Sequence, residues 1–110
     1  MPYYMTQAKY SKDAVQALLA NPQDRGAVVS KLFEAIGGKL HHCFFAFGED
    51  DIVVLYEAPD NTSAAAAILA VAGSGSLSAA KTTVLMTMDE AVAAMKKGGA
   101  VSGTYKPPSG

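Results

Sequence analysis

The sequence has little charge, one cysteine and no tryptophan. Only 17% of its 110 residues are charged, against roughly 25% in an ordinary soluble domain, while 50% are hydrophobic. This balance is the opposite of a disordered composition, and the length fits one domain. The single cysteine, Cys43, excludes an internal disulfide framework and a zinc site built from several cysteines. Nine basic residues stand against ten acidic ones, so no basic excess exists to bind a nucleic-acid backbone.

Long hydrophobic runs are absent as well. The most apolar stretch, Ala64 to Ala72, is mostly alanine. A membrane-spanning helix needs roughly 20 apolar residues, so this stretch is too short. The first five residues, 1–5, lack the basic start and the apolar run of a signal peptide. We therefore expect no contact with a membrane, and a reducing, cytoplasmic location.

Residue patterns predict four strands and four helices. Tyrosine, phenylalanine and β-branched residues favour strands, and apolar residues at helical spacing favour helices. The predicted strands are 3–10, 39–47, 52–57 and 81–88. The predicted helices are 11–20, 21–36, 60–72 and one that begins at Asp89 and ends near Lys97. Asn21 and Pro22 separate the first two helices, because proline suits the first turn of a helix but not its interior.

This order of elements predicts an α+β fold. The first six elements, with the two N-terminal helices counted as one, match the ferredoxin-like βαββαβ arrangement, and a short C-terminal helix follows. Helices then cover one face of the sheet, and the other face needs a cover because it is apolar. A second copy of the chain is the simplest cover, so we expect a homodimer joined through its sheet faces, a dimeric α+β barrel. Residues 1–97 form the expected domain, and 98–110 a Gly/Pro/Ser-rich tail.

Three stretches of the sequence resemble the GYD domain family, which takes its name from a Gly-Tyr-Asp motif. They are Lys9 to Ser11, Gly37 to Leu40, and Gly48 to Val53 followed by Glu57 to Asp60. Together with similar element spacing, the resemblance covers about residues 3 to 95. It implies a small ferredoxin-like dimer of largely uncharacterised function.

The tripeptide that names the family would lie in the turn between the second and third predicted strands. Gly48 and Asp51 match its glycine and aspartate, whereas Asp50 stands at the aromatic position. If the family tyrosine has a binding role, the resemblance implies that this chain has lost that role or fills it with Tyr56 or Tyr4.

His41, His42 and Cys43 form the most reactive cluster in the sequence. Strand alternation predicts that His41 and Cys43 share one face and that His42 occupies the other. His41 and Cys43 would then form a dyad in which the imidazole activates the thiol, or they would be two ligands of a soft metal. A metal site needs at least about three ligands, and the sequence has no histidine or cysteine beyond these three, so a carboxylate or the other subunit would have to supply the third ligand. We favour the simpler interpretation, a small buried cysteine beside polar histidines, with no metal and no cofactor.

Two loops carry weaker signals. Glu49, Asp50 and Asp51 place three carboxylates in one turn, which suits a calcium ion or a carboxyl group with a raised pKa. The turn lacks the spacing of an EF-hand, so a solvated turn is favoured. The loop at 73–76, Gly-Ser-Gly-Ser, follows a predicted helix and lacks the lysine of a phosphate-binding loop, so phosphate binding is disfavoured.

Tyrosines provide the best candidates for a ligand pocket. Tyr4 and Tyr10 share one face of the first predicted strand. Tyr56 lies on the third predicted strand, which is expected to pair with the first. Aromatic rings with hydroxyl tips are suited to lining a small-molecule site. We name Tyr4, Tyr56, His41 and His42 as candidate ligand-binding residues, with membership of the core or the dimer interface as the alternative.

Three functions remain open from the sequence. The first is a homodimeric ligand-binding or regulatory module, which the lack of a catalytic constellation favours. The second is a cofactor-independent enzyme, similar to a monooxygenase or isomerase, that uses His42, Tyr56 and His41 around a cavity between helices and sheet. The third is a metal or redox site at His41 and Cys43. Whether the chain is an enzyme stays undecided at this point.

Overall fold

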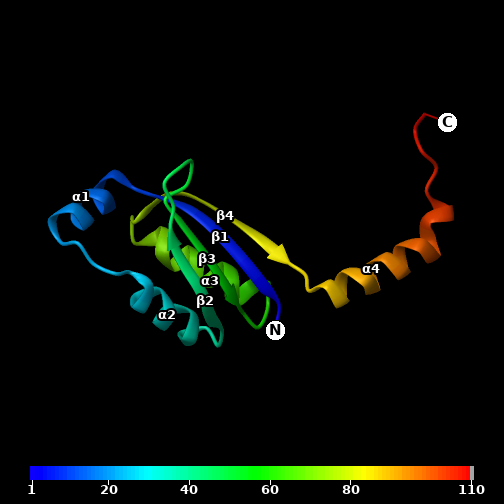
Figure 1. The fold of residues 1–110 in the computed structure, drawn as a ribbon, viewed down its shortest axis with the longest axis horizontal. Helices are drawn as coiled ribbons and strands as arrows, with labels where there is room; N and C mark the ends of the chain where they lie inside the picture. Colours follow the sequence, from blue (N-terminus) through cyan, green and yellow to red (C-terminus); the bar gives the residue numbers. More distant parts are fainter. Residues whose placement is uncertain (110) are drawn as a thin grey trace.

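The structure is a computed structural model that describes residues 1–109 (Figure 1). Its strands and helices follow the predicted order and have these bounds: β1 Tyr3–Tyr10, α1 Lys12–Ala20, α2 Gly26–Ala35, β2 Lys39–Phe45, β3 Ile52–Glu57, α3 Asn61–Gly73, β4 Leu77–Leu85 and α4 Met88–Val101. A short 3-10 turn, Ser102–Thr104, follows α4. Among these residues no helix has both the length and the apolarity needed to cross a membrane.

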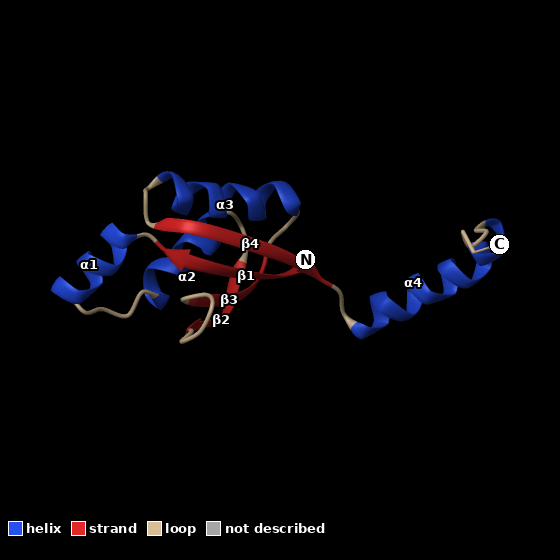
Figure 2. Cartoon of the chain, turned by 90° about the horizontal axis from the view of Figure 1, so that it is seen from above, coloured by secondary structure: helices blue, strands red, loops and turns tan. Residues whose placement is uncertain are grey.

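The four strands form one antiparallel sheet in the order β2-β3-β1-β4. The predicted α+β, ferredoxin-like fold is confirmed, with β1 and β3 as the central pair. Tyr4 lies opposite Tyr56 and Met5 lies opposite Leu55 in this pair. Successive side chains in a strand point to opposite faces. Tyr4 and Tyr56 therefore belong to one face of the sheet, and Met5 and Leu55 belong to the other. The α3 helix lies along the sheet over β1 and β4 (Figure 2).

The core lies between the sheet and the helices α2 and α3. Its largest buried side chains are Tyr4, Tyr56 and Phe33, each at most 1% exposed. The ring of Tyr56 stacks between the other two, with centroids 5.5 Å from Tyr4 and 4.0 Å from Phe33. Ala64 and Ala67 of α3 complete the cluster, since their small side chains let the helix approach the sheet closely. Helices therefore cover a single face of the sheet, which we call the inner face; the opposite side is the outer face.

The first two helices are separated more widely than the sequence predicts. We expect α2 to start at Asn21, but it begins at Gly26. Asn21 has non-helical backbone angles, φ −140° and ψ 79°, and the Asp24 carboxylate accepts a hydrogen bond from the Gly26 amide at 2.8 Å. This local side-chain bond competes with helical backbone bonding. Residues 21–25 are therefore a linker that ends beside the inner face.

Strand β4 and helix α4 also depart from the predicted bounds. The strand starts at Leu77 instead of Lys81, because it pairs with nearly the full length of β1, from Leu85 opposite Tyr3 to Leu77 opposite Tyr10. This pairing overrides the weak strand propensity of serine and alanine. The helix runs past Gly98 to Val101, so it is longer than predicted and includes the first residues of the expected tail. The boundary of the domain itself stays a prediction.

The α4 helix extends away from the sheet (Figures 1 and 2), which explains the elongated shape of 59 × 33 × 22 Å. A complete capping box fixes its start: the Thr87 hydroxyl accepts from the Glu90 amide at 3.2 Å, and the Glu90 carboxylate accepts from the Thr87 amide at 3.1 Å. Met88, Val92 and Met95 form an exposed apolar stripe along it.

Gly38 is the position where the fold tolerates no side chain. It follows Gly37, whose positive φ of 80° ends α2. A Cβ at Gly38 would overlap the backbone oxygen of Glu57 in β3, whereas a Cβ at Gly48 would have no neighbour within 4 Å. We predict that Gly38→Ala lowers the free energy of unfolding by about 1–3 kcal/mol in urea titrations, because the strand must shift. Gly48→Ala is the matched control and changes it little. Equal effects of the two substitutions would contradict this packing.

Candidate functional site

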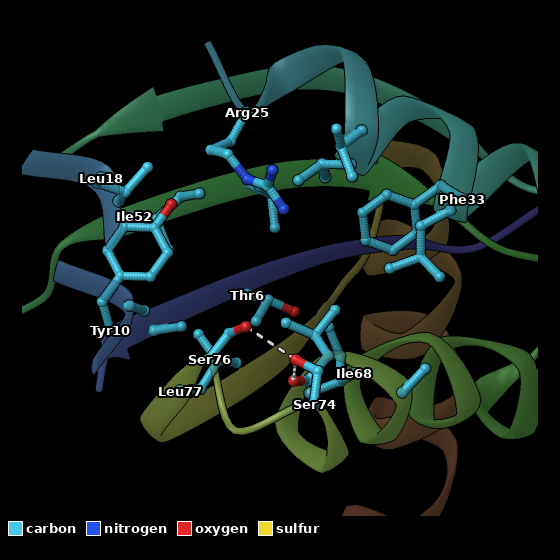
Figure 3. Close-up of a pocket in the computed structure, with 18 of the residues that line it drawn as sticks. Thr6, Tyr10, Leu18, Arg25, Phe33, Ile52, Ile68, Ser74, Ser76 and Leu77 are labelled. Atoms are coloured by element: carbon cyan, nitrogen blue, oxygen red, sulfur yellow. Dashed lines mark hydrogen bonds between the residues drawn. The ribbon is translucent and has the colours of Figure 1, made fainter. Parts of the chain in front are cut away.

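A cleft of about 450 Å³ opens between the inner face and the helices. Volumes of this size are typical of small-molecule sites. Its floor is formed by β1 and β3, which contribute Thr6 and Val54, and its walls come from α1, α2 and α3 (Figure 3). Most of the lining is apolar; Leu18, Phe33 and Ile68 are examples from the three helices. The linker of residues 21–25 separates α1 from α2, and its residues Gln23 and Arg25 line the cleft with both helices.

Polar groups enter this cleft at only a few points. Arg25, the last residue of the linker, directs its guanidinium into the space above the sheet (Figure 3). Its Nη1 donates a hydrogen bond to Oε1 of Gln23 at 2.7 Å. Ser74 and Ser76 lie at another edge, where their hydroxyls are 2.8 Å apart. Arg25 is thus the one charged residue among those that line the cleft.

Tyr10 forms one rim of the cleft, and the predicted motif turn holds it there. The carboxylate of Asp51 accepts a hydrogen bond from the Tyr10 amide at 2.9 Å, and the Asp51 amide donates to the oxygen of Ala8 at 2.9 Å. Burial raises the pKa of the Tyr10 hydroxyl, while the Arg25 guanidinium acts to lower it. The aspartate of the motif therefore fastens the β2–β3 hairpin to the end of β1.

Tyr4 and Tyr56 lie side by side on the inner face, as the sequence predicts, but they belong to the core beneath the cleft. The Tyr56 hydroxyl is 2.9 Å from the Thr6 hydroxyl, which is 2.8 Å from that of Thr82. Tyr4 donates to Oδ1 of Asn61 at 2.7 Å, and burial is the main cause that raises its pKa. Of this network, only Thr6 lines the cleft.

The prediction that His41 and Cys43 share one face of the strand is wrong, because a β-bulge lies between Leu40 and His42. The register of β2 against β3 shifts at His41: Leu40 is opposite Tyr56, and His42 is opposite Leu55. The extra residue of a bulge reverses the alternation of the side chains that follow it. Cys43 therefore packs against the core with Leu40, while His41 lies on the outer face.

Both histidines consequently lie on the outer face. His41 Nε2 is 2.8 Å from a carboxylate oxygen of Glu57, and its ring lies 5.6 Å from the ring of Tyr3. His42 stacks on Phe44 with centroids 5.7 Å apart. The four candidate residues thus divide between two faces of the sheet, and none of them is among the residues that line the cleft. Their role in binding stays a prediction.

Two of the three carboxylates in the β2–β3 turn are engaged with the protein, and Glu49 is exposed. Asp50 forms an ion pair with Lys81 of β4 at 3.3 Å, and Asp51 bonds to β1 as described. Gly48 lies at the exposed tip. Within residues 1–109, no group of three or more His, Cys, Asp or Glu side chains is arranged to hold a metal ion.

Sequence reasoning missed Arg25 and Thr6 as cleft residues. Helical periodicity emphasises apolar stripes, so a lone arginine at a helix start carries no signal of its own. Strand alternation does place Thr6 on the same face as Tyr4. A polar side chain among inward-facing apolar ones was therefore the signal that could have identified Thr6.

The environment of Cys43 predicts a thiol of low reactivity. Burial, with a smaller contribution from the negative charge of Asp24, raises its pKa, so the reactive thiolate is scarce at neutral pH. We expect iodoacetamide to modify the folded chain at least about tenfold more slowly than the urea-unfolded chain at neutral pH. His41→Gln leaves the rate unchanged, because the histidine lies on the other face. A slower reaction in this variant would show that His41 activates the Cys43 thiol and would contradict this interpretation.

Comparison with solved structures finds similar folds at low sequence identity. MtbAldR matches with a TM-score of 0.54 and 15% identity; the match covers 78% of this chain and 52% of that one. The chain therefore spans about half the length of that relative. An uncharacterised NIPSNAP domain protein from Burkholderia xenovorans gives a TM-score of 0.45, 16% identity and coverage of 79% and 94%. Protein Atu4242 from Agrobacterium tumefaciens gives a TM-score of 0.47 and 17% identity, and the match covers 78% of this chain and 92% of that one. No curated protein matches the sequence significantly.

The family comparison agrees with the resemblance carried by the β1, β2 and hairpin residues. The model of the GYD domain matches residues 4–95, which include all of the sheet except Tyr3, the helices α1 to α3 and the start of α4. The chain belongs to the GYD domain family.

Proposed function

We propose that this protein is a homodimeric small-molecule-binding module, in which each protomer binds an apolar ligand in the cleft on its inner face. The observation that carries the proposal is the cleft itself. It has a volume of about 450 Å³, a largely apolar lining and a few polar groups at its edges, which is the usual composition of a ligand site.

The homodimer accounts for the outer face. Met5, Val53 and Leu55 lie at its centre together with the polar Gln7, and Phe44 beside them is 57% exposed. Single exposed apolar side chains are ordinary, but a cluster of them on one sheet face indicates an interaction surface. A second copy that packs its own outer face there would bury these side chains and leave both clefts open.

The α4 helix gives a second reason to expect a partner copy. Met88 is 75% exposed and Met95 is 67% exposed, and both belong to the stripe that faces solvent in the protomer. A helix with an exposed apolar stripe gains stability by packing against another surface. In the proposed dimer, the partner chain provides that surface.

Binding is preferred over catalysis because of where His42 and Tyr56 lie. A cofactor-independent enzyme that uses both needs them around one cavity, yet they occupy opposite faces of the sheet. The cleft offers Arg25 and the hydroxyls of Tyr10 and Thr6, and burial raises the pKa of Tyr10. A phenol with a raised pKa stays protonated at neutral pH, so little phenolate is present to act as a base. The cytoplasmic location stays a prediction.

Ligand binding is tested with N-phenylnaphthylamine, a neutral dye that fluoresces in apolar sites. We expect saturable fluorescence enhancement with one dye per chain. Ala14→Phe, which places a ring in the cleft from α1, lowers the dye affinity at least about tenfold by occupying its volume. Ala93→Phe makes the same change on exposed α4 and serves as the control. Binding that neither substitution alters would place the dye elsewhere and contradict the proposal.

The dimer is tested by light scattering. We expect a mass about twice the 11.4 kDa of one chain. Leu55→Asp, at the centre of the outer face, converts the protein to monomers because it would bury a charge in the sheet interface. Gln16→Asp introduces the same charge on exposed α1 and leaves the dimer intact. A wild-type mass near that of one chain would refute the dimer.

A further inference from the structure

The residues that line the cleft carry positive charge but no negative charge. Among its lining residues Arg25 carries the single charge, and no aspartate or glutamate faces the same space. A guanidinium presents several N–H donors in a planar fork that fits a carboxylate, and it stays charged at any physiological pH. The cleft therefore combines an apolar volume with one fixed positive charge.

Arg25 is also free to receive an anion. It is half-buried, and within residues 1–109 its guanidinium forms no ion pair. Its one hydrogen bond to a side chain goes to Gln23, a neutral amide in the same linker. The side chain does not cap α2 either, since the residue at this helix start makes no side-chain bond to the first turn. The guanidinium as a whole points into the space above the sheet (Figure 3).

We propose that the ligand of the cleft is a small apolar carboxylic acid, with its carboxylate on Arg25 and its apolar body between α1, α2 and α3. The walls on either side of the charge are hydrocarbon, such as Leu18, Val29 and Ile68. A carboxylate carries a single negative charge, which one guanidinium balances. This inference rests on the proposed binding function and names its ligand class.

The hydroxyls of Ser74, Ser76 and Thr6 do not form a second anion site, because they are bonded within the protein. The Ser74 hydroxyl donates to the oxygen of Val71 at 2.6 Å and lies 2.8 Å from the Ser76 hydroxyl. Thr6 is engaged with Tyr56 and Thr82. A phosphate ester brings a larger negative charge and more acceptor oxygens than one arginine satisfies. The cleft thus matches a monoanion better than a phosphorylated ligand.

The test compares two probes of equal length, octanoate and octanamide, as competitors of N-phenylnaphthylamine. We expect octanoate to displace the dye from the wild-type protein at lower concentration than octanamide. Arg25→Gln weakens octanoate binding about 10- to 100-fold, the usual effect of losing a hydrogen bond to a charged group, and leaves octanamide unchanged. Lys31→Gln removes a positive charge from the exposed side of α2 and is the matched control. It leaves both probes unchanged.

Different failures have different meanings. If both probes compete equally and Arg25→Gln affects neither, the carboxylate inference is overturned while the cleft remains a binding site. If Lys31→Gln weakens octanoate as much as Arg25→Gln does, general charge attraction explains the preference, and the specific role of Arg25 is refuted. If the dye itself does not bind, the proposed function fails and the inference fails with it. Thermal unfolding of each variant verifies that the substituted chains fold.

Discussion

A sheet has two faces, and this chain supplies helices for one of them; this constraint shapes the rest of the molecule. The central strands alternate strictly: Tyr4 and Tyr56 point into the core, while Met5 and Leu55 point away from it. A strand that loses water on one face alternates apolar with polar residues. The sequence of β3, apolar from Ile52 to Tyr56, does not. Its pattern is explained if both faces are covered, the inner one by helices and the outer one by a second copy.

The two faces then have different uses. On the inner face, the linker 21–25 separates α1 from α2, and the cleft opens between them with Arg25 at its edge. On the outer face, the bulge at His41 places both histidines beside the apolar centre of the sheet. Packing between copies would therefore involve the outer face, and ligand binding the inner one. In the proposed dimer, the low charge content of the chain matches the need to cover two apolar surfaces.

The sequence predicted the fold well, because alternation and helical periodicity report directly on burial. Strand 3–10, strand 52–57 and the neighbouring positions of Tyr4 and Tyr56 all follow from these patterns. The bulge at His41 was not predictable, since it inserts one residue without a glycine or any other local marker. The start of β4 at Leu77 depends on pairing with β1, a tertiary effect that local propensity does not contain. Arg25 was missed because one arginine at a helix start has no distinctive pattern.

The central claim, that outer faces pack against each other and leave the clefts free, is tested most directly by isotope-filtered NOE spectroscopy on a mixture of labelled and unlabelled chains. The account predicts intermolecular contacts from the methyl groups of Met5 and Leu55, and none from those of Leu18 and Ile68 in the cleft. The absence of contacts at Met5 and Leu55 would contradict the sheet-to-sheet dimer. Intermolecular contacts at Leu18 and Ile68 would mean that the partner chain itself fills the cleft.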